Sequence, residues 1–142
     1  MTSCKKKSSS SSIVDKVESS DVRLDLKYEA LPDDFKEFYK KFHSDSLFQM
    51  SCIFFPLEGL PDNADPDFIG TEKYFFSPDQ WIFQNVLPVE NETYATSYSC
   101  ISNMLIEETV QDKKLDLKLI RRFAKTGGGW RLIYYAGMNK YK

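Results

Sequence analysis

The stretch DDFKEFYKKFHSDSLFQMSCIFFPLEG, residues 33–59, decides the fold of this chain. Pro32 stands where a helix begins, and two aspartates follow in the first turn, where they complement the helix dipole. Over the next residues one face is aromatic and the other is charged: Phe35, Phe38, Tyr39 and Phe42 against Lys36, Glu37, Lys40 and Lys41. This spacing predicts an amphipathic helix that buries one aromatic stripe.

The second half of the same stretch changes from the period of a helix to that of a strand. Ser44 or Asp45 can cap a short second helix that runs to about Met50. From Ser51 to Leu57 apolar residues occupy both faces, which predicts a buried strand. The proline and glycine at the end of the stretch are expected to stop that strand.

The remaining chain has mainly strand patterns. Residues 21–30 predict a short edge strand or an extended lead-in, and the acidic residues 58–73 predict an exposed loop. The alternation slips at Ile120, which is typical of a bulge, and the three glycines 127–129 predict a hairpin turn. Further apolar or alternating segments lie at 74–76, 94–100, 104–110, 115–120 and 130–138. This order predicts an α+β domain with four to six mostly antiparallel strands.

Length and composition limit the possible functions. The chain has 142 residues, enough for one domain with a real core, and 42% of them are hydrophobic. The formal net charge is -2. Binding to nucleic acid requires a concentrated basic face, so nucleic acid is not expected as a partner.

The first 20 residues differ from the rest. Three lysines follow Cys4 and five serines follow the lysines, so residues 1–20 predict a flexible tether and residues 21–142 a single domain. Small residues before Cys4 resemble the end of a bacterial lipoprotein signal. The charged and apolar parts of a signal peptide do not precede it, so this interpretation requires a sequence that starts just before the lipid site. It predicts a lipoprotein of the bacterial cell envelope, anchored in the membrane through Cys4; the alternative is a cytosolic protein with a basic N-terminus.

Two segments carry a resemblance to known proteins. The segments FYKKFHSDSLFQMSCIFFPLEGL (38–60) and RFAKTGGGWRLIYY (122–135) look like the nuclear transport factor 2-like (cystatin-like) superfamily. The first further resembles a family of uncharacterised lipoproteins from Gram-negative gut anaerobes. The resemblance covers about residues 31–138 and implies a long N-terminal helix packed on a curved, mostly antiparallel sheet that forms a cone with a pocket. It implies no particular reaction, because the superfamily includes both enzymes and binding domains.

The sequence has no complete catalytic or metal-binding motif. His43, the only histidine, is expected to complement the dipole at the end of the helix rather than to act as a base. The residues 63–67 alternate like a calcium loop but lack its glycine and its last glutamate. Without a Cys-x-x-Cys pair no zinc site is expected, and no cofactor is predicted. Cys52 and Cys100 lie in apolar runs and are expected to be free buried thiols, although an oxidising envelope would allow them to pair.

The aromatic excess is the remaining indication of a site, because so many hydroxyls cannot all be buried and satisfied. Arg122 could reach into a pocket as an anion clamp, or lie on a solvated face. Glu107 or Glu108 would enter the cone if the strand register turns one of them inward. The predicted pocket residues are Tyr39, Trp81, Tyr98, Arg122 and Tyr134. We therefore expect a domain that binds a small molecule or a protein; the alternatives are an isomerase- or dehydratase-type enzyme and a homodimeric structural module.

Overall fold

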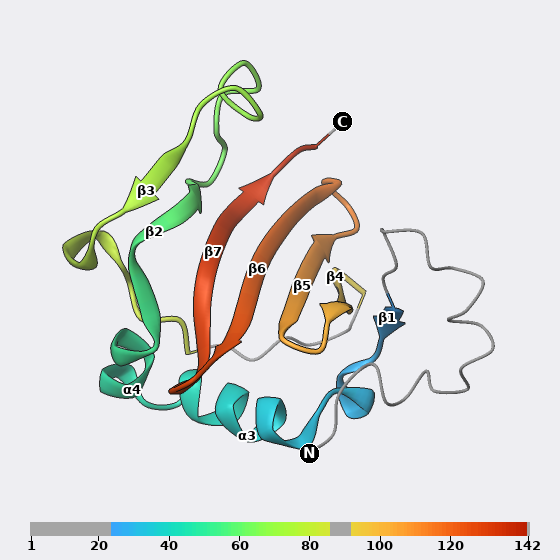
Figure 1. The fold of residues 1–142 in the computed structure, drawn as a ribbon. Helices are drawn as coiled ribbons and strands as arrows, with labels where there is room; N and C mark the ends of the chain where they lie inside the picture. Colours follow the sequence, from blue (N-terminus) through green and yellow to red (C-terminus); the bar gives the residue numbers. More distant parts are fainter. Residues whose placement is uncertain (1–23, 86–91, 142) are drawn as a thin grey trace.

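The computed structural model describes residues 24–85 and 92–141. Its helices and strands are labelled as in Figure 1. In chain order they are β1 (Leu24–Leu26), the 3-10 helix η1 (Tyr28–Ala30), α3 (Asp33–Phe42), α4 (Ser46–Ser51), β2 (Ile53–Leu60), β3 (Tyr74–Phe76), the 3-10 helix η2 (Pro78–Gln80), β4 (Tyr94–Ser102), β5 (Leu105–Asp112), β6 (Leu117–Thr126) and β7 (Gly129–Asn139). The predicted tether at residues 1–20, with Cys4, lies outside the described residues.

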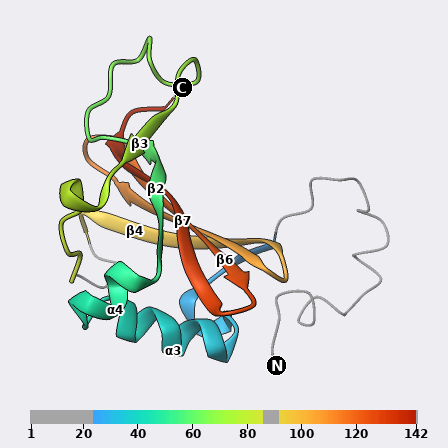
Figure 2. The same ribbon diagram turned by 60° about the vertical axis from the view of Figure 1, so that its left-hand side comes forward.

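The seven strands form one sheet in the order β1-β4-β5-β6-β7-β2-β3. All neighbouring strands are antiparallel except β2 and β7, which are parallel, so the expectation of a mostly antiparallel sheet is confirmed. The sheet is curved, and α3 and α4 lie together along one side of it (Figures 1 and 2). The bulge predicted at Ile120 is also confirmed, because the pairing of β6 with β7 shifts register between Lys118 and Ile120.

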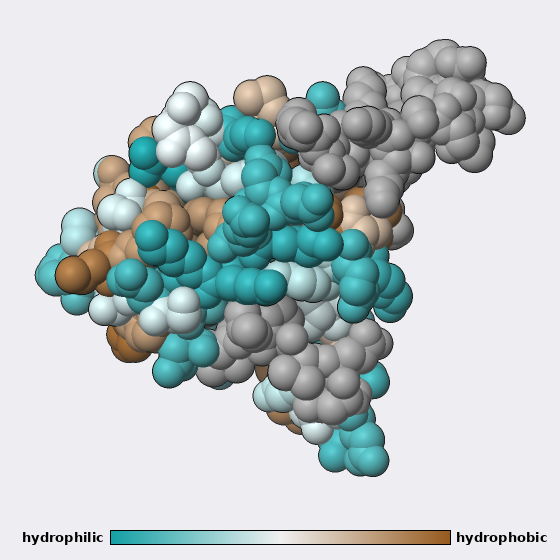
Figure 3. Space-filling view, turned by 90° about the horizontal axis from the view of Figure 1, so that it is seen from below, coloured by the Kyte–Doolittle hydropathy of each residue, from teal (hydrophilic) through white to brown (hydrophobic). Residues whose placement is uncertain are grey.

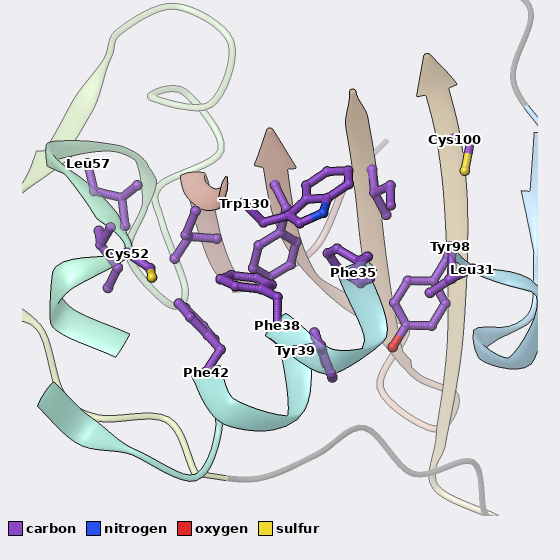
Figure 4. Packing of buried hydrophobic residues seen from close by; sticks show 14 residues of the cluster. Leu31, Phe35, Phe38, Tyr39, Phe42, Cys52, Leu57, Tyr98, Cys100 and Trp130 are labelled. Atoms are coloured by element: carbon purple, nitrogen blue, oxygen red, sulfur yellow. The ribbon is translucent and has the colours of Figure 1, made fainter. Parts of the chain in front are cut away.

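Helix α3 begins and ends where the sequence predicts, but it is not the long helix expected from the resemblance. It has only ten residues, and its four aromatic side chains are buried. Figure 4 shows them pointing from the helix toward the strands. The ring of Phe35 lies 5.3 Å from that of Phe123 and 5.1 Å from that of Trp130, centroid to centroid. Viewed from the α3 side, hydrophilic side chains run across the middle of the surface, with hydrophobic ones beside them on the left (Figure 3); a hydrophilic outer face is expected for a helix with one buried face.

Strand β2 differs from its prediction in two ways. It continues through Pro56 and Gly59 to Leu60, and it is buried on one face only, since Phe54 is 61% exposed. Sterics explain why β2 continues through Gly59. A Cβ atom there would lie 1.7 Å from the carbonyl oxygen of Tyr135, so the glycine lets β2 approach β7 closely. A predicted strand terminator is thus a point of contact between strands.

Candidate functional site

A buried carboxylate, Glu108 of β5, is the centre of the candidate site. It is fully buried, and the strand pairing places it beside Tyr98 of β4 on one flank and Arg121 of β6 on the other. The hydroxyl of Tyr98 donates to Oε2 of Glu108 at 2.9 Å, and Nη1 of Arg121 donates to Oε1 at 2.5 Å. The hydroxyl of Tyr39, from α3, also donates to Oε2. Three donors from three elements therefore hold one carboxylate on the helix-facing side of the sheet.

The charges of this cluster keep all of its donors protonated. Burial, together with the negative charge of Glu108, raises the pKa of Tyr39 and of Tyr98 far above the ordinary value of a tyrosine. Burial lowers the pKa of Arg121, but the adjacent carboxylate of Glu108 outweighs this effect and the net change is upward. Both phenols remain neutral donors and the guanidinium remains charged at neutral pH.

An irregular segment contacts this cluster through Arg121. We call residues 77–85 the strap; it begins with a capping box at Ser77, continues through η2 and ends without regular structure. Trp81 is the C-cap of η2, and its Nε1 donates to Oε1 of Gln49 at 2.8 Å. Further along the strap, Ile82 is 80% exposed. The strap is thus attached both by polar contacts and by the ring of Trp81, whose centre lies 5.3 Å from that of Tyr135, while Ile82 faces solvent.

Gln84 makes most of the contacts between the strap and the interior. The N–H of Gln84 donates to Oε1 of Gln49, and Nε2 of Gln49 donates to the carbonyl oxygen of Gln84, both at 3.0 Å. Its side-chain oxygen accepts from Nε of Arg121 at 3.0 Å. Arg121 therefore joins the buried carboxylate Glu108 to the strap.

His43 contacts the same residue of the strap. It is the C-cap of α3 and only 2% exposed. Burial and the charge of Arg121 lower its pKa to about 4, so the ring is neutral at pH 7. The predicted cationic complement to the helix dipole is therefore wrong. Nδ1 lies 2.7 Å from the carbonyl oxygen of Gln84 and must carry the proton, while Nε2 has no hydrogen-bond partner among the described residues.

The neutral state of His43 predicts a loss of stability in acid. Since the folded pKa lies below the ordinary 6.5, the unfolded chain binds the extra proton between about pH 6.5 and pH 4. The free energy of unfolding is expected to fall by about 3 kcal/mol as the pH drops through this window. Urea denaturation at several pH values measures the slope. In His43→Asn, which keeps a donor near the Nδ1 position, the slope should be flatter; equal slopes in both proteins would contradict the assignment.

The five predicted pocket residues do not form one cluster. Tyr39 and Tyr98 meet at Glu108, and Trp81 lies on the strap beside Gln49. Arg122 and Tyr134 lie on the opposite face of the sheet, because successive side chains of a strand alternate.

On that opposite face, Arg122 is bound by protein groups. Its Nε donates to Oε2 of Glu107 at 2.7 Å, and its guanidinium carbon lies 4.3 Å from the centre of the Tyr134 ring. The carboxylate that enters the interior is Glu108, one of the two glutamates the sequence left open. The sequence does not predict Arg121, Gln49 or Gln84 as site residues. For Arg121 a signal exists: it alternates with Arg122 along β6 and therefore lies on the same face of the sheet as its partner Glu108.

Further features of the described residues bear on the predictions from the sequence. No group of three or more histidine, cysteine or acidic side chains there could hold a metal ion, and no described helix is long and apolar enough to cross a membrane. Cys52 is a free buried thiol as predicted. Cys100 is disulfide-bonded, so the expectation of a free thiol there is wrong, and the two cysteines do not pair with each other. A surface hollow of about 450 Å³ lies in the β2–β3 region, lined by Pro61, Ala64, Asp65, Asp67, Phe68, Glu72 and Tyr74.

Comparison with known proteins identifies the fold. No family model matches the chain, and no curated protein matches it. Among solved structures it is similar to a nuclear transport factor 2-like protein from Bacteroides fragilis, with a TM-score of 0.55, 23% identity, and coverage of 74% of this chain and 46% of that one. It is also similar to a cystatin-like protein from Bacteroides caccae, with a TM-score of 0.53, 20% identity, and coverage of 72% and 74%. The chain thus spans less than half of the first of these proteins. Its described part has the nuclear transport factor 2-like, cystatin-like fold.

Proposed function

We propose that this chain is a binding domain that takes a small molecule or a peptide segment onto the helix-facing side of its sheet. The observation that supports this function is the strap. Its Gln84 is attached to interior polar groups by hydrogen bonds, which a polar ligand can replace one for one. A purely structural cover would be expected to pack all of its apolar side chains inward, as Trp81 does, yet Ile82 is 80% exposed.

Catalysis is less well supported by the same groups. Both oxygens of Glu108 already accept hydrogen bonds and one of them pairs with Arg121, so this carboxylate is a poor general base. The observation that favours the isomerase- or dehydratase-type alternative is Nε2 of His43, a neutral imidazole nitrogen without a partner among the described residues. Such a base would have to touch the substrate, and the ring is only 2% exposed.

The homodimeric module would be recognised by a dimer mass in light scattering.

A binding screen tests the proposed function. The ¹⁵N-labelled chain is titrated with a library of small polar molecules and short peptides, and the shifted amide signals are mapped. We expect the shifts to gather on the strap and on α4, where Gln49 lies. Arg122→Gln, which changes only the opposite face, should bind the same compounds as the wild type. Shifts confined to that opposite face, or none in the whole library, would contradict the proposal.

We further propose that the domain is held at the bacterial envelope by a lipid on Cys4, as its resemblance to gut-anaerobe lipoproteins suggests. Since the chain has three cysteines and Cys52 is free, this proposal requires the disulfide of Cys100 to join a cysteine of another molecule. Cells that express the gene with its own leader are grown with an alkyne fatty acid. The label is expected on the wild type and on Cys52→Ser, and it should be lost in Cys4→Ser. Retention of the label in Cys4→Ser, or recovery of a Cys4 peptide disulfide-linked to Cys100, would show that the proposal is wrong.

A further inference from the structure

Gln84 is held by the interior as a bound ligand would be held. The side chain of Gln49 contacts both backbone polar groups of Gln84: Oε1 accepts from the N–H and Nε2 donates to the carbonyl oxygen, each at 3.0 Å. Nδ1 of His43 is 2.7 Å from the same carbonyl oxygen, and Nε of Arg121 donates to the side-chain oxygen at 3.0 Å. The side chain also reaches the hydroxyl of Tyr135. Backbone and side chain of one residue are therefore recognised together.

We propose that these groups are a recognition site for a glutamine residue of a peptide, and that Gln84 occupies it while the strap is closed. This inference rests on the proposed binding function and names its ligand class. The incoming peptide would present its N–H and C=O to Gln49 and its primary carboxamide to Arg121, and the strap would leave. Gln49 is itself fully buried and fixed by donation from Nε2 to the carbonyl oxygen of Phe42 at 2.8 Å. A site group held in this way requires little reorganisation when the occupant changes.

The charge of the site selects an amide over a carboxylate. The guanidinium of Arg121 is already neutralised by Glu108, to which its Nη1 donates at 2.5 Å. A second carboxylate on the Nε side would place two buried negative charges around one positive charge, which is unfavourable. A neutral carboxamide accepts the same hydrogen bond without adding charge. The site should therefore prefer glutamine to glutamate, which an ordinary exposed arginine would not.

The strap competes with any external peptide because it is part of the same chain. A short covalent link gives Gln84 an effective concentration in the millimolar range at this site. A peptide in solution must exceed that concentration or bind with additional contacts. Weakening the hold of Gln84 is therefore expected to increase the affinity for an external amide.

In the first experiment, a small amide is added to a variant in which the side chain of Gln84 is truncated. Gln84→Ala keeps the backbone contacts and removes a group of the size of acetamide. We expect acetamide to bind this variant with a Kd in the millimolar range, as its few atoms allow, and to shift the Nε–H signal of Arg121. Acetate should bind at least tenfold more weakly, and neither compound should shift that signal in the wild type. Equal binding of acetamide and acetate would overturn the proposal.

The second experiment uses peptides. Acetyl-Ala-Gln-Ala-amide is expected to bind Gln84→Ala at least tenfold more tightly than it binds the wild type, and its Glu counterpart at least tenfold more weakly than the Gln peptide. No gain in peptide affinity for Gln84→Ala would overturn the proposal. The wild-type screen described above distinguishes the two claims. Ligands that bind the helix-facing side without preference for an amide would support the binding function and contradict only the glutamine site.

A third measurement does not depend on the truncated variant. Gln84→Glu keeps the size of the side chain but places a carboxylate beside Glu108 on the same guanidinium. Amide hydrogen exchange in the strap is expected to become at least tenfold faster than in the wild type. Gln80→Glu is the matched control, because Gln80 lies on the same strap in a capping box where glutamate serves equally well. Equal exchange in Gln84→Glu and Gln80→Glu would contradict the charge argument.

Discussion

Replacing Arg121 with methionine is expected to lower the free energy of unfolding by about 3–5 kcal/mol. The substitution leaves Glu108, which is fully buried, without the cation that pairs with it at 2.5 Å. The two tyrosine hydroxyls still donate to the carboxylate, but they supply no opposite charge. Urea denaturation near pH 7 measures the change.

The two ion pairs that cross β5 and β6 provide a control. Arg122 pairs with Glu107 on the other face, but the side chain of Arg122 is 38% exposed, whereas that of Arg121 is 8% exposed. Arg122→Met is therefore expected to cost only about 1 kcal/mol or less. A cost for Arg122→Met as large as that for Arg121→Met would show that burial does not decide the effect.

A double-mutant cycle separates the pair from its surroundings. In Arg121→Met with Glu108→Leu, neither buried charge remains, so the double variant should lose less stability than the sum of the single variants, by about 1–3 kcal/mol. It should still be less stable than the wild type. The hydroxyls of Tyr39 and Tyr98 then lack their acceptor, and an unsatisfied buried donor costs about 1–3 kcal/mol. Additive losses would mean that the two charges do not interact.

The sequence predicted the helix-facing core because that signal is local. The stripe of α3 is fixed by 3.6-residue spacing within ten residues, and its four rings are all buried as expected. The polar interior was harder to predict because its contacts are distant in sequence: Tyr39 and Glu108 are 69 residues apart. Strand alternation could show that one of Glu107 and Glu108 points inward, but not which one, since a shift of one residue exchanges the faces.

The same one-residue ambiguity explains why the sequence indicates Arg122, and not Arg121, as a pocket residue. Arg122 was proposed for the pocket, and its neighbour Arg121 is the one that enters the interior. Gln84 could not be found at all by pattern, because the end of the strap has no regular period. Its position is set by hydrogen bonds to Gln49 and Arg121, which lie 35 and 37 residues away. The part of the site on which the proposed binding function rests is thus the part that periodicity does not encode.

Replacing Phe123 with alanine is expected to lower the free energy of unfolding by about 3–5 kcal/mol. The ring is fully buried on β6, and its centre lies 5.3–6.0 Å from the ring centres of the four aromatic residues of the α3 stripe: Phe35, Phe38, Tyr39 and Phe42. These contacts are edge-to-face, and each such pair adds about 0.5–1.5 kcal/mol beyond burial. Because one truncation removes a partner from every ring of the stripe, the neighbours cannot refill the space by moving a single side chain.

The helix should therefore loosen before the rest of the domain. α3 has only ten residues, and an isolated helix of that length is marginal in water, so its stability depends on packing against the sheet. In Phe123→Ala, the α3 amides are expected to exchange at least tenfold faster relative to those of β5 than in the wild type. Phe54→Ala is the control; it removes the same side chain from β2 at a site that is 61% exposed, and should cost about 0.5 kcal/mol or less. Similar losses for both variants, or unchanged exchange in α3, would mean that the aromatic stripe does not hold the helix to the sheet.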